Sequence, residues 1–121
     1  FVQRAVVTTA LAMGMALAIR CTYYNPRPFV LGLGRMLMEH DATTSFPSFH
    51  ATFLFSLALP LFAQRGARST GLAIVLLGLG IAWARIFVGV HYPLDMAGAF
   101  ITAAIATAIA CAVFKQPKAH R

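Results

Sequence analysis

Charge is scarce in this sequence, and acidic residues are almost absent. Only 11% of the 121 residues are charged, with 10 Lys and Arg against 3 Asp and Glu. Hydrophobic residues make up 60%, and the mean hydropathy is +0.76. In a soluble globular domain about a quarter of the residues are charged, so the composition excludes that class. It is typical of an integral membrane protein, and the length suits a single domain.

Four apolar stretches without any charged residue predict an all-α, polytopic membrane helix bundle with four transmembrane helices. Each approaches the length that crosses a hydrocarbon core of about 30 Å. The stretches are 5–19, 51–64, 69–84 and 96–114. A short turn at 65–70 makes the second and third helices antiparallel neighbours. The two cysteines, Cys21 and Cys111, then fall near opposite membrane faces, so we expect no disulfide between them.

Small residues predict where these helices pack, because they allow close approach of two backbones. In the third helix they are Gly71, Gly78 and Ala82. In the fourth helix they form a stripe at four-residue spacing, which is Gly98, Thr102, Ala106 and Ala110.

The basic residues give a net charge of +7 but do not form a nucleic-acid site. They lie at the ends of the apolar stretches and are not interleaved with aromatics on one face, which argues against nucleic acid as a partner. With four alternating helices, one membrane side receives six basic and no acidic residues: Arg4, Arg65, Arg68, Lys115, Lys118 and Arg121. The positive-inside rule makes that side cytoplasmic. We therefore expect the remaining polar residues to lie on the opposite, non-cytoplasmic side of the membrane.

Three short polar clusters interrupt the apolar chain, and all of them map to that second membrane face. Together they supply arginine forks that can grip phosphate oxygens, two histidines that can move protons and a carboxylate that can orient one histidine. The clusters are Arg20 with Arg27-Pro28, then Pro47-Ser48-Phe49-His50, then Arg85 followed by His91 and Asp95.

His91 and Asp95 are four residues apart across Pro93, where a helix is expected to begin. The Asp95 carboxylate can then reach back one turn to Nδ1 of His91 and leave Nε2 free as a nucleophile. The simpler alternative is a helix-terminal acid beside an interfacial histidine. His50 and Ser48 open another predicted helix, whose N-terminal N–H groups suit an anion.

The arginines have simpler explanations as well, and a metal site is a further alternative. Arg85 can extend to the membrane interface, whereas Arg27, between two prolines, is harder to explain as an anchor. Potential metal ligands are numerous: Glu39, His40, Asp41, His50, His91 and Asp95. Arginine forks fit phosphate better than they tolerate a divalent cation, so we expect no metal and no cofactor.

The three clusters resemble the signature motifs of the type-2 phosphatidic acid phosphatase superfamily in order, spacing and helical context. Three runs resemble most closely its bacterial undecaprenyl-diphosphatase branch: Pro26-Arg27-Pro28-Phe29, Ser45-Phe46-Pro47-Ser48 and Val88-Gly89-Val90-His91-Tyr92-Pro93-Leu94-Asp95. The resemblance implies that His91 attacks phosphorus to form a phosphohistidine, that Asp95 orients it and that His50 protonates the leaving group. It implies that the phosphoryl oxygens are held by Arg20, Arg27, Ser48 and Arg85.

Three positions depart from the pattern of that family. Arg20 stands where Lys is usual, Ala84 where a Ser usually precedes the arginine, and Phe49 where Gly or Asp is usual. Phe49 is the largest change, because a bulky ring beside the phosphate can narrow the pocket or contact lipid. The family fold has six spans, so residues 1–121 are expected to be one membrane-embedded domain whose N-terminal helices are missing.

The resemblance thus implies a metal-independent lipid phosphatase of cell-wall biosynthesis, located in a bacterial inner membrane with its site facing the periplasm. The expected reaction converts undecaprenyl diphosphate to undecaprenyl phosphate and phosphate, with a polyprenyl or phospholipid phosphate arriving through the bilayer. Phosphatidate or phosphatidylglycerophosphate is the alternative substrate. A non-catalytic membrane binding or transport module is the alternative function, although a transporter usually places its polar groups near the bilayer midplane.

Overall fold

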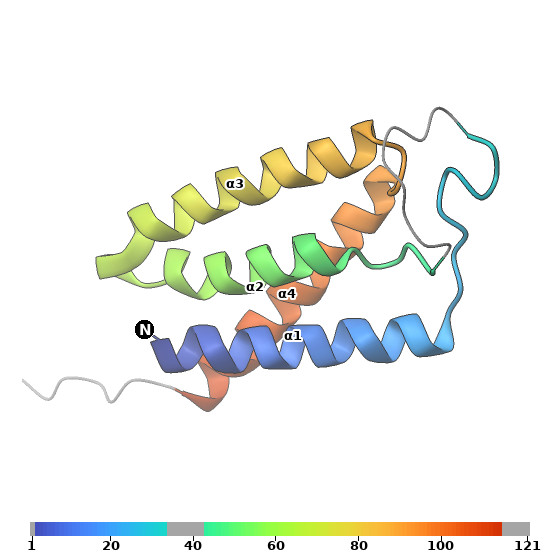
Figure 1. Ribbon diagram of the computed structural model, residues 1–121. Helices are drawn as coiled ribbons and strands as arrows, with labels where there is room; N and C mark the ends of the chain where they lie inside the picture. Colours follow the sequence, from blue (N-terminus) through green and yellow to red (C-terminus); the bar gives the residue numbers. More distant parts are fainter. Residues whose placement is uncertain (1, 34–42, 115–121) are drawn as a thin grey trace, which may run out of the picture.

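The computed structural model describes residues 2–33 and 43–114, and this part of the chain is helical with short connections (Figure 1). The predicted all-α fold is therefore confirmed for the described residues. The four helices are α1 (Val2–Thr22), α2 (Phe49–Phe62), α3 (Arg68–Phe87) and α4 (Pro93–Val113), and a single 3-10 turn, η1 (Arg65–Ala67), joins α2 to α3.

Three of these segments are long and apolar enough to cross a membrane, namely Gln3–Thr22, Arg65–Phe87 and Pro93–Val113. The fourth predicted span, α2, is also an apolar helix, but it has only 14 residues. At about 1.5 Å per residue it is about 21 Å long, which is less than a hydrocarbon core of about 30 Å. Large apolar side chains are exposed along the helices, such as Trp83 at 69% and Phe87 at 65%. The protein is thus a membrane protein with a short central helix.

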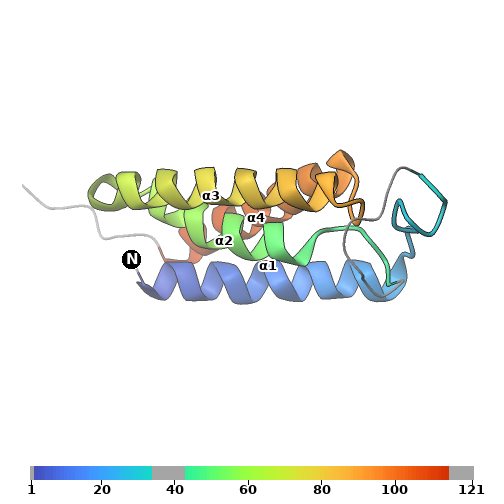
Figure 2. The same cartoon turned by 45° about the horizontal axis from the view of Figure 1, so that its top comes forward.

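Helix α2 is the centre of the bundle and contacts each of the other three helices. It lies between α1 and α3, and α4 crosses them at an angle (Figures 1 and 2). The core is built from one bulky ring, Phe55, and small or flexible side chains, which are Ala51, Ala82, Met96, Ala99 and Ala103. These small side chains let α3 and α4 approach the backbone of α2 closely.

The predicted packing faces are confirmed. The buried residues of α3 are the three predicted small ones, and the predicted stripe of α4 is buried throughout. A Cβ atom at Gly71 would lie 2.7 Å from the Phe62 Cα and 2.9 Å from the Ala58 carbonyl oxygen. Glycine is therefore required where the start of α3 crosses the end of α2.

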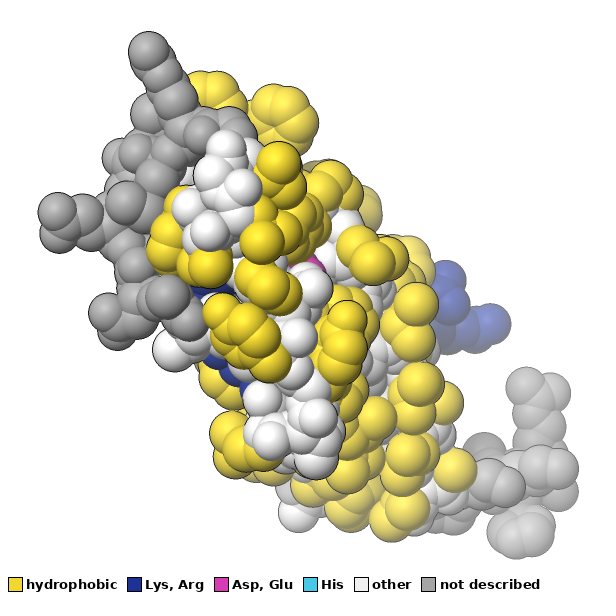
Figure 3. Space-filling model, turned by 90° about the vertical axis from the view of Figure 1, so that its right-hand side faces the viewer, with side chains coloured by type: hydrophobic (Ala, Val, Ile, Leu, Met, Phe, Trp, Pro, Cys, Tyr) yellow, Lys and Arg dark blue, Asp and Glu magenta, His cyan; other side chains and the backbone are white. Residues whose placement is uncertain are grey.

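The alternating helix directions bring the polar clusters to one end of the bundle. The last turns of α1 and α3 and the first turns of α2 and α4 meet there, on the right in Figure 1, beside the segments 23–33 and 43–48. Figure 3 views this end, where small patches of basic side chain show between apolar ones, and a more distant basic side chain projects at the edge of the view. The sequence also predicts a loop after the first helix with a short interfacial helix around residues 33–40, but residues 34–42 lie outside the described part of the chain.

Candidate active site

Three of the four predicted phosphate-binding residues line one small pocket of about 130 Å³ at this end of the bundle. Its lining residues are Arg20, Arg27, Thr43, Phe49, His50, Arg85 and His91. Arg20 comes from the last turn of α1, His50 from the first turn of α2 and Arg85 from the last turn of α3. Five of the predicted site residues therefore share one pocket, although they are widely separated in the sequence.

The predicted hydrogen bond between His91 and Asp95 is present. Nδ1 of His91 lies 3.2 Å from Oδ2 of Asp95, and the two side chains are 2% and 0% exposed. Because α4 begins at Pro93, Asp95 lies in its first turn and also accepts a hydrogen bond of 2.8 Å from the Tyr92 backbone N–H. The Asp95 carboxylate thus caps the N-terminus of α4 and orients the His91 ring at the same time.

Arg27 is buried and hydrogen-bonded along its whole guanidinium group. Its Nε donates to the Thr43 carbonyl at 3.0 Å, and Nη1 donates to the Val90 carbonyl at 3.0 Å. Its Nη2 donates to the Thr43 hydroxyl at 3.1 Å and to the Thr44 carbonyl at 3.2 Å. Arg27 is only 2% exposed, which is inconsistent with a membrane-interface anchor. It is a fixed cation at the wall of the pocket.

Nη1 of Arg27 also lies 3.0 Å from Nε2 of His91. A guanidinium group can only donate, so Nε2 must accept and the histidine proton must reside on Nδ1, facing Asp95. Burial lowers the pKa of His91, and the charge of Arg27 lowers it further against the opposing effect of Asp95. Burial, and then the charges of Arg20 and Arg85, lower the pKa of Arg27 to about 10, so it stays protonated at neutral pH. His91 is therefore held as the neutral tautomer with its lone pair toward the pocket.

Phe49, the most divergent motif residue, has a defined contact. The guanidinium carbon of Arg20 lies 4.1 Å from the centroid of the Phe49 ring, and Arg20 Nη1 donates to the Pro47 carbonyl at 3.2 Å. A cation over an aromatic face is attracted to it. The ring therefore lines the pocket and supports Arg20.

Two other motif positions lie away from the pocket lining. Ser48 is fully buried and caps α2, and its hydroxyl accepts a hydrogen bond of 3.3 Å from the Ala51 N–H. Its predicted contact with phosphate stays a prediction. Ala84, where the family usually has Ser, is exposed and does not line the pocket.

Sequence reasoning assigned no role to three residues of the site, although Ser45 belongs to one of the motif runs. Thr43 binds Arg27 with both its carbonyl and its hydroxyl, and Ser45 and Asn25 stand behind Asp95. Polar residues in loops carry no periodic signal, so only their proximity to the motifs could have drawn attention to them.

The metal alternative rests partly on residues that lie outside the described chain, namely Glu39, His40 and Asp41. Within residues 2–33 and 43–114, no three His, Cys, Asp or Glu side chains are grouped so that they could hold a metal ion. Metal independence stays a prediction.

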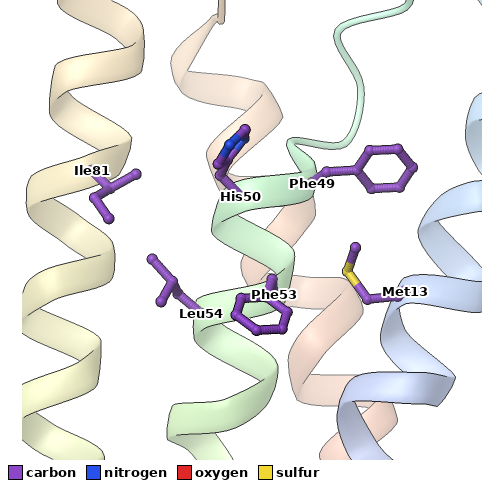
Figure 4. A pocket seen from close by; sticks show the side chains of 6 residues that line it. All are labelled: Met13, Phe49, His50, Phe53, Leu54 and Ile81. Carbon is purple, nitrogen blue, oxygen red and sulfur yellow. The ribbon is translucent and has the colours of Figure 1, made fainter.

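An apolar pocket of about 360 Å³ adjoins the site (Figure 4). Phe49 and His50 line both pockets, and the other lining residues are Met13, Phe53, Leu54 and Ile81. The pocket thus lies among α1, α2 and α3 and begins beside the histidine of α2.

Comparison with known proteins agrees with this geometry. YbjG of Escherichia coli K12 is 36% identical over 107 residues, covering 85% of this chain and 54% of that protein. The undecaprenyl-diphosphatase BcrC of Bacillus subtilis 168 is 37% identical, covering 72% of this chain and 44% of that protein. The bacitracin transport permease protein BcrC of Bacillus licheniformis is 33% identical, covering 77% of this chain and 45% of that protein.

The chain spans about half the length of these curated relatives. No solved structure matches it significantly. The PAP2 superfamily matches residues 1–118. Because that match covers nearly the whole sequence, the chain belongs to the PAP2 superfamily.

Proposed function

We propose that the protein is a metal-independent lipid phosphatase that converts undecaprenyl diphosphate to undecaprenyl phosphate through a phosphohistidine. The observation that carries this proposal is the single pocket in which three arginines and two histidines meet, with Asp95 bonded behind His91. Phosphoryl transfer depends mainly on positioning and on stabilisation of charge, and these side chains provide both.

In the first step the arginines hold the terminal phosphoryl group and Nε2 of His91 attacks phosphorus. The P–N bond forms as the P–O bond to the leaving group breaks, and His50 gives its proton to the leaving oxygen. Nη1 of Arg27 has to transfer its hydrogen bond from Nε2 to a phosphoryl oxygen before attack. Substrate binding thereby exposes the nucleophile. Asp95 stabilises the positive charge that develops on the ring.

In the second step water attacks the phosphohistidine. The P–N bond breaks, His50 takes up a proton from the water, and inorganic phosphate leaves. Both histidines then return to their starting protonation states, so the cycle balances without a metal or cofactor. Each step uses general acid–base chemistry at a side chain that already lines the pocket.

The dimensions and polarity of the two pockets support a lipid phosphate as the substrate class. The polar pocket of about 130 Å³ is small, is lined by cationic side chains and has room for a phosphoryl group. The apolar pocket begins at His50, where the leaving group would sit. The name of the Bacillus subtilis relative favours undecaprenyl diphosphate among such lipids. Phosphatidate and phosphatidylglycerophosphate also end in a terminal phosphoryl group and are the alternative substrates.

The name of the Bacillus licheniformis relative supports a transport function as the second candidate. Against it, the described ionisable groups of the pocket lie at the ends of helices or in the connections between them, and not at the middles of helices. A transport site is expected near the bilayer midplane. We therefore favour the enzyme, with the pocket facing the periplasm of a bacterial inner membrane.

The test is phosphate release from the purified protein in detergent, with undecaprenyl diphosphate, phosphatidate and phosphatidylglycerophosphate as separate substrates. Wild type should release phosphate, whereas His91→Ala and His50→Ala should abolish release and remain folded. Only His91→Ala should also prevent trapping of a labelled phosphoenzyme. Full activity in His91→Ala would refute the mechanism. Inactivity of wild type on every lipid phosphate would favour the binding or transport module.

A further inference from the structure

A buried chain of hydrogen bonds continues behind Asp95, on the side away from the pocket. The Ser45 hydroxyl donates to Oδ1 of Asp95 at 3.2 Å, and Nδ2 of Asn25 donates to that hydroxyl oxygen at 2.8 Å. The Ser45 backbone N–H donates in turn to the Asn25 carbonyl at 2.9 Å. Ser45 and Asp95 are both 0% exposed. Neither Ser45 nor Asn25 lines the phosphate pocket.

The chemistry of these groups fixes the direction of each bond. The Asn25 amide N–H₂ can only donate, so the Ser45 oxygen accepts from it and directs its own proton to Asp95. Oδ2 of Asp95 already receives the Tyr92 N–H and faces Nδ1 of His91. Both carboxylate oxygens are therefore held, each by donors from a different segment of the chain. A carboxylate fixed at one oxygen alone could still rotate about its terminal bond.

The same two segments also hold Arg27. Asn25 lies two residues before Arg27, and Ser45 follows Thr43 and Thr44, whose carbonyls accept hydrogen bonds from the Arg27 guanidinium. The loop contacts that set the position of the arginine are thus continuous with those that set the orientation of His91. The two groups must act on the same phosphorus atom in the proposed reaction, so a shared support keeps them in register.

We propose that Ser45 and Asn25 are positioning residues, which act through Asp95 to hold the His91 imidazole in line for attack on the phosphoryl group that Arg27 grips. This inference rests on the proposed function. It assigns a role in the reaction to two residues that touch no substrate. Holding the two loops together is a separate task, because other hydrogen bonds also join them. The Thr44 hydroxyl accepts from the Asn25 backbone N–H at 3.0 Å and donates to the Tyr23 carbonyl at 3.2 Å.

The principal test compares Ser45→Ala with Ser56→Ala. Both substitutions remove a fully buried serine hydroxyl, but Ser56 bonds to Thr9 and the Phe53 carbonyl and lies away from the site. We expect Ser45→Ala to lower kcat about tenfold, the cost of one weakened hydrogen bond to a charged group. Its KM should change less than twofold, since the phosphate contacts remain. Ser45→Thr, which keeps the hydroxyl, should restore most of kcat, and Ser56→Ala should retain wild-type kcat.

A double-mutant cycle separates positioning from general loosening. In an Asp95→Asn background, Ser45→Ala should add less than a twofold loss, because its effect passes through the carboxylate. Asn25→Ala, at a half-buried position, should lower kcat about threefold, because it removes one hydrogen bond of the series that ends at Asp95. This variant provides the test if Ser45→Ala does not fold. Equal losses in Ser45→Ala and Ser56→Ala, a loss confined to KM, or additivity with Asp95→Asn would overturn the inference.

A second readout does not depend on activity. In protein labelled with ¹⁵N-histidine, the Nδ1 proton of His91 should exchange slowly with solvent in wild type and in Ser56→Ala, and clearly faster in Ser45→Ala and Asn25→Ala. Unchanged exchange in both of the latter variants would overturn the inference even for an inactive protein. If wild type releases no phosphate but the Nδ1 proton of His91 exchanges as expected in all variants, the proposed function is refuted. The role of Ser45 and Asn25 in holding His91 would still be established.

Discussion

Asp95→Asn tests how firmly the protein holds the tautomer of His91. The substitution preserves the shape of the side chain and removes its negative charge. Oδ2 of Asp95 faces two groups, the Tyr92 N–H at 2.8 Å and His91 Nδ1 at 3.2 Å. A backbone N–H can only donate, so the oxygen of an asparagine amide has to take the Oδ2 position. His91 can then continue to donate from Nδ1.

Arg27 acts on the other side of the same ring. Its Nη1 lies 3.0 Å from His91 Nε2 and would meet an N–H there if the tautomer were inverted. Two donors therefore oppose the inversion that makes the equivalent substitution in a serine-protease triad cost about 10⁴-fold. What remains is the loss of charge in one hydrogen bond, which is worth about 1.5–3 kcal/mol, or about 10- to 150-fold in kcat.

The assay is the rate of phosphate release and of phosphoenzyme formation in a single turnover, compared with wild type at the same degree of folding. KM should stay close to the wild-type value, because Asp95 does not line the pocket. A loss of 10⁴-fold or more would show that the tautomer inverts despite Arg27. A loss below threefold would show that the charge of Asp95 has no part in the reaction. Asp95→Ala should also destabilise the fold, since the buried Ser45 hydroxyl and the Tyr92 N–H lose their acceptors.

Four further outcomes are expected. The pKa of His91 should lie below the ordinary histidine value of about 6.5, because burial favours the neutral ring. The neutral ring is the nucleophile, so kcat/KM should fall only as the pH drops through that lowered pKa. An NMR titration that gives a pKa of 6.5 or above would contradict this. Activity should survive exhaustive chelation, and loss with EDTA followed by recovery with zinc or magnesium would make the histidines and carboxylates metal ligands. Phe49→Gly and Phe49→Asp should each change the ranking of lipid phosphates by kcat/KM, because the Phe49 ring lines both pockets and supports Arg20. Activity of both variants should still depend on His50 and His91. An unchanged ranking would exclude Phe49 from substrate selectivity. A membrane-impermeant thiol reagent should label Thr43→Cys and not Ser69→Cys in intact spheroplasts of variants lacking the native cysteines, and the reverse pattern refutes the periplasmic orientation.

Much of the fold could be read from the sequence because the bilayer imposes simple rules. Long uncharged runs predict helices, and Pro93 marks the start of α4 where it was expected. Small residues at four-residue spacing predict the buried face of α4, since a helix brings such positions onto one side. The spacing of His91 and Asp95 likewise predicts their hydrogen bond, because one helical turn separates them. The second predicted span is displaced by two positions, because the apolar stretch is 51–64 whereas α2 spans Phe49–Phe62, and both have 14 residues.

Only the tertiary structure decided which groups meet between segments. The contact of Arg27 with His91 joins residues 64 positions apart, and the chain from Asn25 through Ser45 to Asp95 spans 20 and then 50 positions. Such contacts depend on where four packed helices place the ends of irregular loops, and loops have no periodic pattern that encodes their neighbours. The stacking of Arg20 on Phe49 is of the same kind. By itself the sequence determined which polar residues the chain carries and that they gather at one end of the helix bundle, because composition and helical spacing are local properties. The packing determined which nitrogen of His91 is available and what holds it there, because those facts depend on distances between segments far apart in the chain.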